Sequence, residues 1–189
     1  MLKEIVVGIG ILASQATHPI GSLLWREIPK EYKIFMADFR VYSPRQGAMA
    51  MEIQRYLYSL CKKRGLDYSI LLALIEIESG FSSSARSAQN AQGYMQIIPK
   101  WHKPLMRKLG VTDLYDAKGN LEVGTAILAA HLEDYGGDYL KALTAYNLGG
   151  GGAAKIFAKG KQGNQYAYHI VARAAQIRRE LNATKNSGR

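Results

Sequence analysis

Residues 70–79 read ILLALIEIES, and this stretch decides the fold. Its apolar residues surround a helix almost completely, which is typical of a helix that is buried in a core or spans a membrane. The stretch is too short to cross a bilayer, because a spanning helix needs about 20 apolar residues. It therefore predicts the central, buried helix of a globular domain.

Apolar residues recur at helical spacing on both sides of this helix. The helices predicted from this spacing lie over 51–63, 70–79, 99–109, 120–135, 138–146 and 165–181. Gly65 is expected to end the first of them, Pro99 to begin the third and Asp138 to cap the fifth. Ser69 is the expected cap of the central helix.

Two segments are predicted to be irregular. Residues 82–92 are rich in Ser, Ala, Gln and Asn, so we expect a loop, and Gly149 to Gly152 are expected to break the chain as a mobile turn. Strand is expected only in a short piece near 93–97. The sequence predicts a mainly α fold with a very small β element.

The chain is expected to hold one domain with extensions at both ends. A short charged start, an apolar run over 5–13 and small residues at 14–16 predict a signal peptide over 1–16. The alternative is a short apolar helix that stays on the chain. We predict an N-terminal extension over 17–50, the main domain over 51–182 and a flexible basic tail over 183–189.

The formal net charge of +10 favours anionic partners such as nucleic acid, anionic lipid or an anionic polymer. Charge alone does not choose among them, and a solvated basic face is the plainer interpretation. Cys61 is the only cysteine and the four histidines are scattered, so we predict no metal and no cofactor. Specific nucleic-acid binding would rest on charge alone and is not predicted.

One carboxylate stands out on the central helix. Glu78 follows Leu71, Leu74 and Ile75 at spacings of seven, four and three residues, so it shares their apolar face. Burial of a carboxyl raises its pKa, and a raised pKa is what a general acid for glycoside cleavage needs at neutral pH. The alternative is that Glu78 lies near the helix end and is solvated. Glu76 is expected to point elsewhere as an ordinary surface charge.

Several motifs follow Glu78 in a recognisable order. They are Glu78-Ser-Gly-Phe81, Gly93-Tyr-Met-Gln-Ile-Ile-Pro99 and Ala145-Tyr-Asn-Leu-Gly149. With Gly65-Leu-Asp67 before them, they resemble the catalytic domain of the soluble lytic transglycosylases, relatives of goose-type lysozyme. The resemblance covers about 55–181 and implies a lysozyme-like fold.

The resemblance also implies roles for individual residues. It makes Glu78 the catalytic acid, and it assigns substrate-binding positions to Ser87, Gln96, Tyr146, Asn147 and Tyr166. Tyr168 competes with Tyr166 for the family's late tyrosine. Two residues depart from the family pattern: Asn90 stands at a usual glycine, and Tyr94 at a usual leucine. Asn tolerates unusual backbone angles, so we expect the loop to keep its shape.

The implied reaction needs one acid. Most glycosidases use two carboxylates, but no second acid occupies a motif position; Asp113, Asp116 and Glu122 are near only in sequence. In the family's mechanism the acid protonates the oxygen between N-acetylmuramic acid and N-acetylglucosamine. It then takes the proton of the muramic acid's own C6 hydroxyl, which closes a 1,6-anhydro ring.

Other functions remain open at this stage. A lysozyme-type muramidase would use water in place of the C6 hydroxyl, and a wall-binding component of a virion or of a secretion or conjugation apparatus would grip glycan without cutting it. The glycines of 148–155 lack the Gly-Lys-Ser/Thr ending of a phosphate-binding loop. The expected partner is the glycan strand of peptidoglycan. The protein could also belong to a larger envelope-spanning or virion assembly and make peripheral contact with a membrane or an anionic polymer. The expected location is the periplasm or envelope, or a virion.

Overall fold

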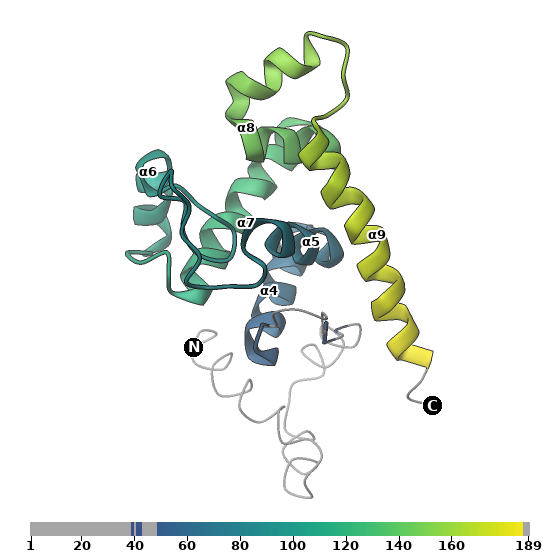
Figure 1. Cartoon of the computed structure of the whole chain (residues 1–189). Helices are drawn as coiled ribbons and strands as arrows, with labels where there is room; N and C mark the ends of the chain where they lie inside the picture. Colours follow the sequence, from purple (N-terminus) through teal and green to yellow (C-terminus); the bar gives the residue numbers. More distant parts are fainter. Residues whose placement is uncertain (1–38, 40, 43–48, 187–189) are drawn as a thin grey trace, which may run out of the picture.

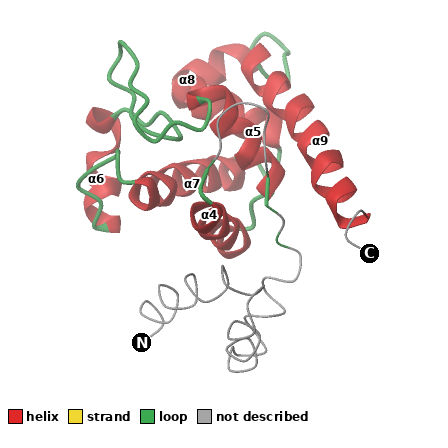
Figure 2. Ribbon diagram, turned by 60° about the horizontal axis from the view of Figure 1, so that its bottom comes forward, coloured by secondary structure: helices red, strands yellow, loops and turns green. Residues whose placement is uncertain are grey.

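The computed structural model describes residues 39, 41–42 and 49–186. The helices in this part are α4 (Met51–Arg64), α5 (Tyr68–Ser79), α6 (Pro99–Leu109), α7 (Ala117–Asp134), α8 (Tyr139–Phe157) and α9 (Gln165–Asn186). Helix α5 packs against α9 and α4, while α7 packs against α4, α6 and α8 (Figure 1). The prediction of a mainly α fold is confirmed, and Figure 2 shows how completely helices and loops make up the domain.

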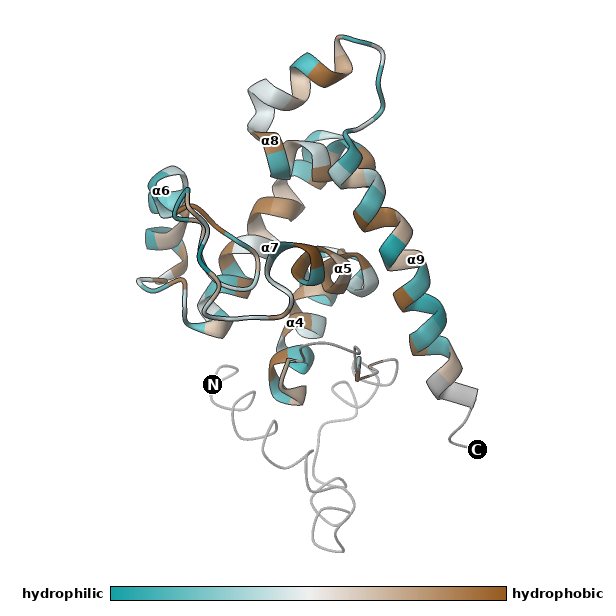
Figure 3. Ribbon diagram, in the orientation of Figure 1, coloured by the Kyte–Doolittle hydropathy of each residue, from teal (hydrophilic) through white to brown (hydrophobic). Residues whose placement is uncertain are grey.

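Helix α5 is the buried centre that its sequence predicts. Its residues from Leu71 to Ile75 are 0% exposed, and Figure 3 shows its apolar colouring between the more polar outer faces of its neighbours. Its cap is Asp67, because the carboxylate accepts hydrogen bonds from the backbone N–H of Ser69 at 2.9 Å and of Ile70 at 3.4 Å. The prediction that Ser69 caps this helix is therefore wrong.

The other helix ends follow the same physical signals, with some shifts. Helix α6 has the predicted bounds, with Pro99 in its first turn and the left-handed Gly110 after its end. Helix α7 begins three residues earlier than predicted, because Asp116 caps it by accepting from Gly119 N at 2.6 Å. Helix α9 runs on to Asn186, beyond the predicted end at Leu181.

The predicted break in the chain is present at the first of the glycines after Tyr146, and the next three are helical. Helix α8 continues through them to Phe157 and is kinked at Gly149, whose φ of 69° and ψ of 166° are not helical. The kink carries Leu148 over Gly152, where a Cβ atom would lie 2.7 Å from the Leu148 Cβ. Gly150–Gly152 still take helical angles after this break, because a glycine weakens a helix by only about 1 kcal/mol.

The segment between α5 and α6 is a loop with isolated pairing. Single antiparallel bridges join Arg86 to Gln92 and Gln92 to Ile97, which confirms the very small β element. Asn90 has a φ of 66°, the left-handed conformation that its residue type was expected to tolerate. Tyr94 is 7% exposed and fills space in the core.

The core begins before residue 51. Tyr42 and Met49 are buried, and the Gln54 amide holds both: it accepts from Tyr42 N and donates to Tyr42 O and Met49 O at 2.7–2.9 Å. The predicted signal peptide lies outside the described residues, as does most of the 17–50 extension. Among the residues that are described, no helix is both long enough and apolar enough to cross a membrane.

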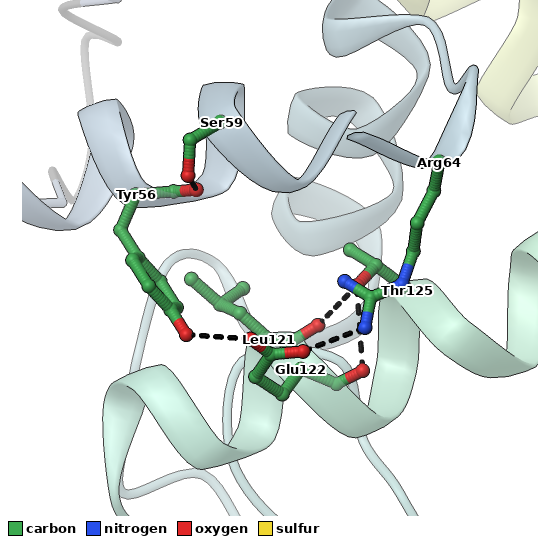
Figure 4. Close-up of polar contacts among 6 residues, drawn as sticks. All are labelled: Tyr56, Ser59, Arg64, Leu121, Glu122 and Thr125. Atoms are coloured by element: carbon green, nitrogen blue, oxygen red, sulfur yellow. Dashed lines mark hydrogen bonds and ion pairs between the residues drawn. The ribbon is translucent and has the colours of Figure 1, made fainter. Parts of the chain in front are cut away.

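Helix α4 is fastened to α7 by a polar cluster that Figure 4 shows. Glu122 of α7 accepts hydrogen bonds from Arg64 at 2.6 Å and from the Tyr56 hydroxyl at 2.7 Å, and Arg64 also donates to Thr125. Burial alone would raise the pKa of Glu122, but the bonds from Arg64 and Tyr56 outweigh it, and the pKa lies below its usual value. Glu122 is thus committed to an ion pair, not to proton transfer.

The expectation that Glu76 is an ordinary surface charge is wrong. Its carboxylate accepts two hydrogen bonds from the Arg173 guanidinium of α9, at 2.9 and 3.2 Å, and Arg173 also donates to the Tyr42 hydroxyl. The pair is largely shielded, with Arg173 and Glu76 side chains 25% and 29% exposed. It ties α5 to α9.

We expect Glu76→Gln to lower the free energy of unfolding by about 1 kcal/mol, because the amide keeps one hydrogen bond but loses the charge. The melting temperature should then fall by about 2–4 °C. Glu133→Gln is the control, since Glu133 is exposed on α7. Equal melting temperatures for the two variants would show that the Glu76–Arg173 pair adds no stability.

Candidate active site

Glu78 lies at the end of α5, half-buried against the core. Burial raises the pKa of this carboxyl, and a hydrogen bond from Tyr166 lowers it in part, with the net result above the usual 4.5. The direction is the one that its apolar helix face predicts. A carboxyl of this kind holds its proton closer to neutral pH, as a general acid must.

Tyr166 is the hydroxyl partner of Glu78. It lies in the first turn of α9, and its hydroxyl donates a hydrogen bond to Glu78 Oε1. Burial, followed by the nearby charge of Glu78, raises the pKa of Tyr166, so the phenol stays protonated and donates. Tyr168 is 50% exposed instead. The structure brings Tyr166, not Tyr168, to the carboxylate.

Tyr146 completes the surroundings of Glu78 from α8. Its hydroxyl donates to the backbone carbonyl of Met95 at 2.8 Å. Its pKa is raised well above the usual value, first by burial and then by the charge of Glu78. Three helices and the loop that contains Met95 therefore meet at this carboxyl.

Asn120 of α7 fixes the loop beneath the site, a role that sequence reasoning did not assign. Its side-chain oxygen accepts from Met95 N at 2.9 Å, and its nitrogen donates to Gln92 O and Leu114 O at 2.8 Å each. The residue is 1% exposed. Gly93 approaches the Asn120 side chain so closely that no side chain would fit at position 93.

Gln96 and Ser87 lie in the same loop and hold its shape. The Gln96 amide nitrogen donates to Ala85 O at 3.2 Å and Gly93 O at 3.0 Å, and its φ of 46° is unusual for a residue with a side chain. The Ser87 hydroxyl oxygen accepts from Ala91 N at 3.1 Å. Strained backbone of this kind gathers at functional sites. Phe81 is 5% exposed and packs on Tyr42, so it fills the core.

Asn147 is exposed, and its side-chain oxygen accepts from the Asn164 amide at 2.9 Å. Asn164 in turn caps α9 by accepting from Ala167 N at 2.9 Å, and its own N–H donates to Thr144. This chain of bonds places the first turn of α9, and with it Tyr166. Asn164 was missed, although an Asn directly before a predicted helix is a capping signal.

Residues 56–169, more than half of the chain, match the sequence model of the transglycosylase SLT domain. The chain belongs to the SLT transglycosylase family. The match spans every side chain described around Glu78. The resemblance noted from the motifs is thereby confirmed.

Individual relatives agree with this family. A protein named membrane-bound lytic murein transglycosylase C from Photorhabdus laumondii is 31% identical over 114 residues, which are 53% of this chain and 32% of that protein. A protein of the same name from Actinobacillus pleuropneumoniae is 30% identical over 132 residues, 59% of this chain and 35% of that one. The SLT chain thus corresponds to about a third of the length of these relatives.

Two solved structures share the fold. The lytic transglycosylase Slt of Pseudomonas aeruginosa, solved as an inactive variant with a glutamate replaced by glutamine, superposes with a TM-score of 0.60 at 27% identity, over 69% of this chain and 24% of that one. The 70 kDa soluble lytic transglycosylase SLT70 of Escherichia coli gives a TM-score of 0.58 at 19% identity, over 66% and 24%. The lysozyme-like fold of the SLT domain is therefore present here.

One carboxyl, that of Glu78, lies among these contacts. Within the part of the chain that the structure describes, burial and the Tyr166 bond account for the pKa shift of Glu78, and no second carboxylate contributes. Asp116 caps α7, Asp113 accepts from Tyr115 N, and Glu122 is paired with Arg64. In the same residues no group of three His, Cys, Asp or Glu side chains is arranged to hold a metal ion.

Proposed function

We propose that the chain is a peptidoglycan lytic transglycosylase that cleaves the MurNAc-β-1,4-GlcNAc bond and leaves 1,6-anhydro-MurNAc. The observation that carries this proposal is the half-buried Glu78, held by Tyr166, in a chain of the SLT family. The lytic transglycosylase names of its relatives support the same activity.

The reaction runs on the single carboxyl. Protonated Glu78 gives its proton to the bridging oxygen, and the bond from that oxygen to C1 of the muramic acid breaks. The carboxylate then takes the proton of the C6 hydroxyl as O6 bonds to C1. No water is consumed, so the products together have the mass of the substrate. The Tyr166 hydroxyl stabilises the carboxylate form between these two steps.

The remaining predicted residues take supporting roles in this proposal. Tyr146 and Tyr166 orient the acid and border the sugar, while Ser87, Gln96 and Asn147 contact the glycan. Gln96 and Ser87 sit in the loop that Asn120 fixes, which keeps their side chains in place between turnovers. Asn147 is exposed and is available to a substrate hydroxyl or acetamido group.

We also propose an exported protein that acts in the periplasm or envelope, or in a virion. The word membrane-bound in the names of its relatives supports an envelope location. Local wall opening within a larger envelope-spanning or virion assembly would suit a domain of this size.

An assay on purified peptidoglycan sacculi tests the proposed substrate specificity. The chain should release soluble muropeptides from sacculi and leave chitin, which contains only N-acetylglucosamine, intact. Both sugars carry a C6 hydroxyl, so this contrast tests the proposed specificity for muramic acid on the C1 side of the cleaved bond. Binding to sacculi without release would favour the wall-binding alternative, and equal cleavage of chitin would refute the proposed specificity.

Replacing Tyr166 should change both the rate and its pH dependence. In Tyr166→Phe the hydrogen bond that lowers the pKa of Glu78 is lost, so this pKa should rise further. The protonated form of Glu78 starts the reaction. The decline of kcat/KM at high pH, where Glu78 loses this proton, should therefore move to higher pH. The loss of orientation should reduce the maximal rate about 10- to 100-fold.

The measurement is a pH–rate profile of muropeptide release, with Tyr168→Phe as the control because Tyr168 is exposed. The control should match the unaltered chain. An alkaline limb that stays in place or moves to lower pH in Tyr166→Phe would contradict the assigned contact.

A further inference from the structure

Helix α6 carries positive charge without any acidic residue. Its sequence PKWHKPLMRKL holds Lys100, Lys103, Arg107 and Lys108, all of them exposed. Lys100, Lys103 and Arg107 follow one another at intervals of three and four, which places them on one face of the helix, and Lys108 widens this face by about 100°. In the described part of the chain, none of the four is in an ion pair.

An exposed tryptophan borders this cationic face. Trp101 is 68% exposed, more than any other large apolar side chain of the described residues, and the Lys100 ammonium lies 4.6 Å from its ring centroid. Pro104 on the same side of the helix is also exposed. The outer face thus combines an aromatic ring, an apolar ring and four cations.

The opposite face fixes α6 to the domain. Met106 is buried and Leu105 partly buried, and α6 packs on α7. The groups around Glu78 come instead from α5, α8, α9 and the loop at Met95 (Figure 1). The outer face of α6 supplies none of these groups, and its use does not depend on the proposed activity.

We propose that the outer face of α6 docks on an anionic phospholipid bilayer. Tryptophan is enriched at the membrane interface, where its ring lies among the headgroups. A helix with one cationic face that lies flat on the surface brings all four cations within the screening length of the anionic headgroups. Each basic residue at such a surface strengthens binding about fivefold. Trp101 and Pro104 place apolar rings on the same outer face as the cations, which is the combination that an anionic bilayer interface takes up.

Trp101 itself can report the contact. The chain has two tryptophans, so in full-length Trp25→Phe only Trp101 emits. Vesicles of phosphatidylcholine with phosphatidylglycerol should shift its emission to the blue and protect it from acrylamide. Pure phosphatidylcholine vesicles should not, and high salt should reverse the effect because exposed charges are screened. Unchanged Trp101 emission with anionic vesicles would overturn the proposal.

Matched charge removal separates the α6 face from general basicity. In the Trp25→Phe background, Lys100→Ser with Lys103→Ser should weaken vesicle partitioning about 30-fold. Lys159→Ser with Lys161→Ser removes the same charge from the exposed α8–α9 connection and should change partitioning by less than about threefold. All of these chains share the apolar segment over 5–13. Any affinity of that segment for lipid is therefore the same in each variant and does not affect the comparison.

Equal losses in the two variants would refute a specific face. A soluble polyanion that produces the same blue shift as the vesicles would also refute lipid docking and assign the face to an anionic polymer. The release of muropeptides from dissolved glycan fragments should be the same in the α6 variant as in the unaltered chain. A failure of the proposed activity would therefore be seen separately from a failure of lipid docking.

Discussion

Glu78→Gln should reduce the release of muropeptides from sacculi by at least about 10⁴-fold. General acid–base groups contribute about 10²- to 10⁴-fold, and here one carboxyl serves both proton transfers. The amide keeps the size of the side chain and can still meet the Tyr166 hydroxyl, but it cannot deliver or accept the proton. Glu76 lies two residues before Glu78, on another side of the helix, and contacts Arg173, so Glu76→Gln should keep nearly full activity.

The same substitution should not unfold the chain. The folded state holds the proton of Glu78 more tightly than the unfolded state, since the pKa is raised above 4.5. Its contribution to stability is complete below that value and is lost as the pH rises through the higher folded pKa. A neutral amide avoids this loss, so Glu78→Gln should melt at the same temperature as the unaltered chain or slightly higher at pH 7. Near-normal cleavage by the folded variant would contradict the assignment of Glu78.

Gly93→Ala should have the largest effect on stability. An added Cβ at this position would lie 2.2 Å from Asn120 Nδ2 and 2.4 Å from Leu114 O, and the φ of +72° is unfavourable for alanine. Asn120 cannot move aside, because three hydrogen bonds hold it. We expect a loss of about 3 kcal/mol or more, which lowers the melting temperature by about 6–12 °C.

Gly151→Ala is the matched control. Gly151 lies inside α8, and a Cβ there meets nothing within 4 Å. Alanine should therefore stabilise the helix by about 0.5–1 kcal/mol. Thermal melts of the two variants side by side test the contrast. If Gly93→Ala had the same melting temperature as the unaltered chain, the close packing of Asn120 against this turn would be refuted.

The sequence predicted those elements whose ends carry strong local signals. Helix α6 has the predicted bounds because proline begins it and a left-handed glycine follows it. The cap of α5 was misjudged because both Asp67 and Ser69 can cap, and the carboxylate of Asp67 reaches two N–H groups. The break predicted at the glycines is confined to Gly149, and no local pattern distinguishes it from the helical Gly150–Gly152.

The site was predictable to a similar degree. The apolar face around Glu78 predicted a buried acid, and the family motifs singled out Tyr146 and Tyr166. The pairing of Glu76 with Arg173 joins residues 97 positions apart, and Asn120 reaches Met95 from another helix, so neither contact could be predicted from local sequence. Asn164 did carry a local signal, in its position directly before α9.

Digestion of sacculi in H₂¹⁸O, followed by mass spectrometry of the released muropeptides, tests the central claim most directly. If the C6 hydroxyl is the nucleophile and Glu78 the only acid, the new ends are 1,6-anhydro-MurNAc, contain no ¹⁸O and disappear with Glu78→Gln. Reducing ends that carry ¹⁸O would show that water attacks C1, and the chain would then be a muramidase in place of a lytic transglycosylase.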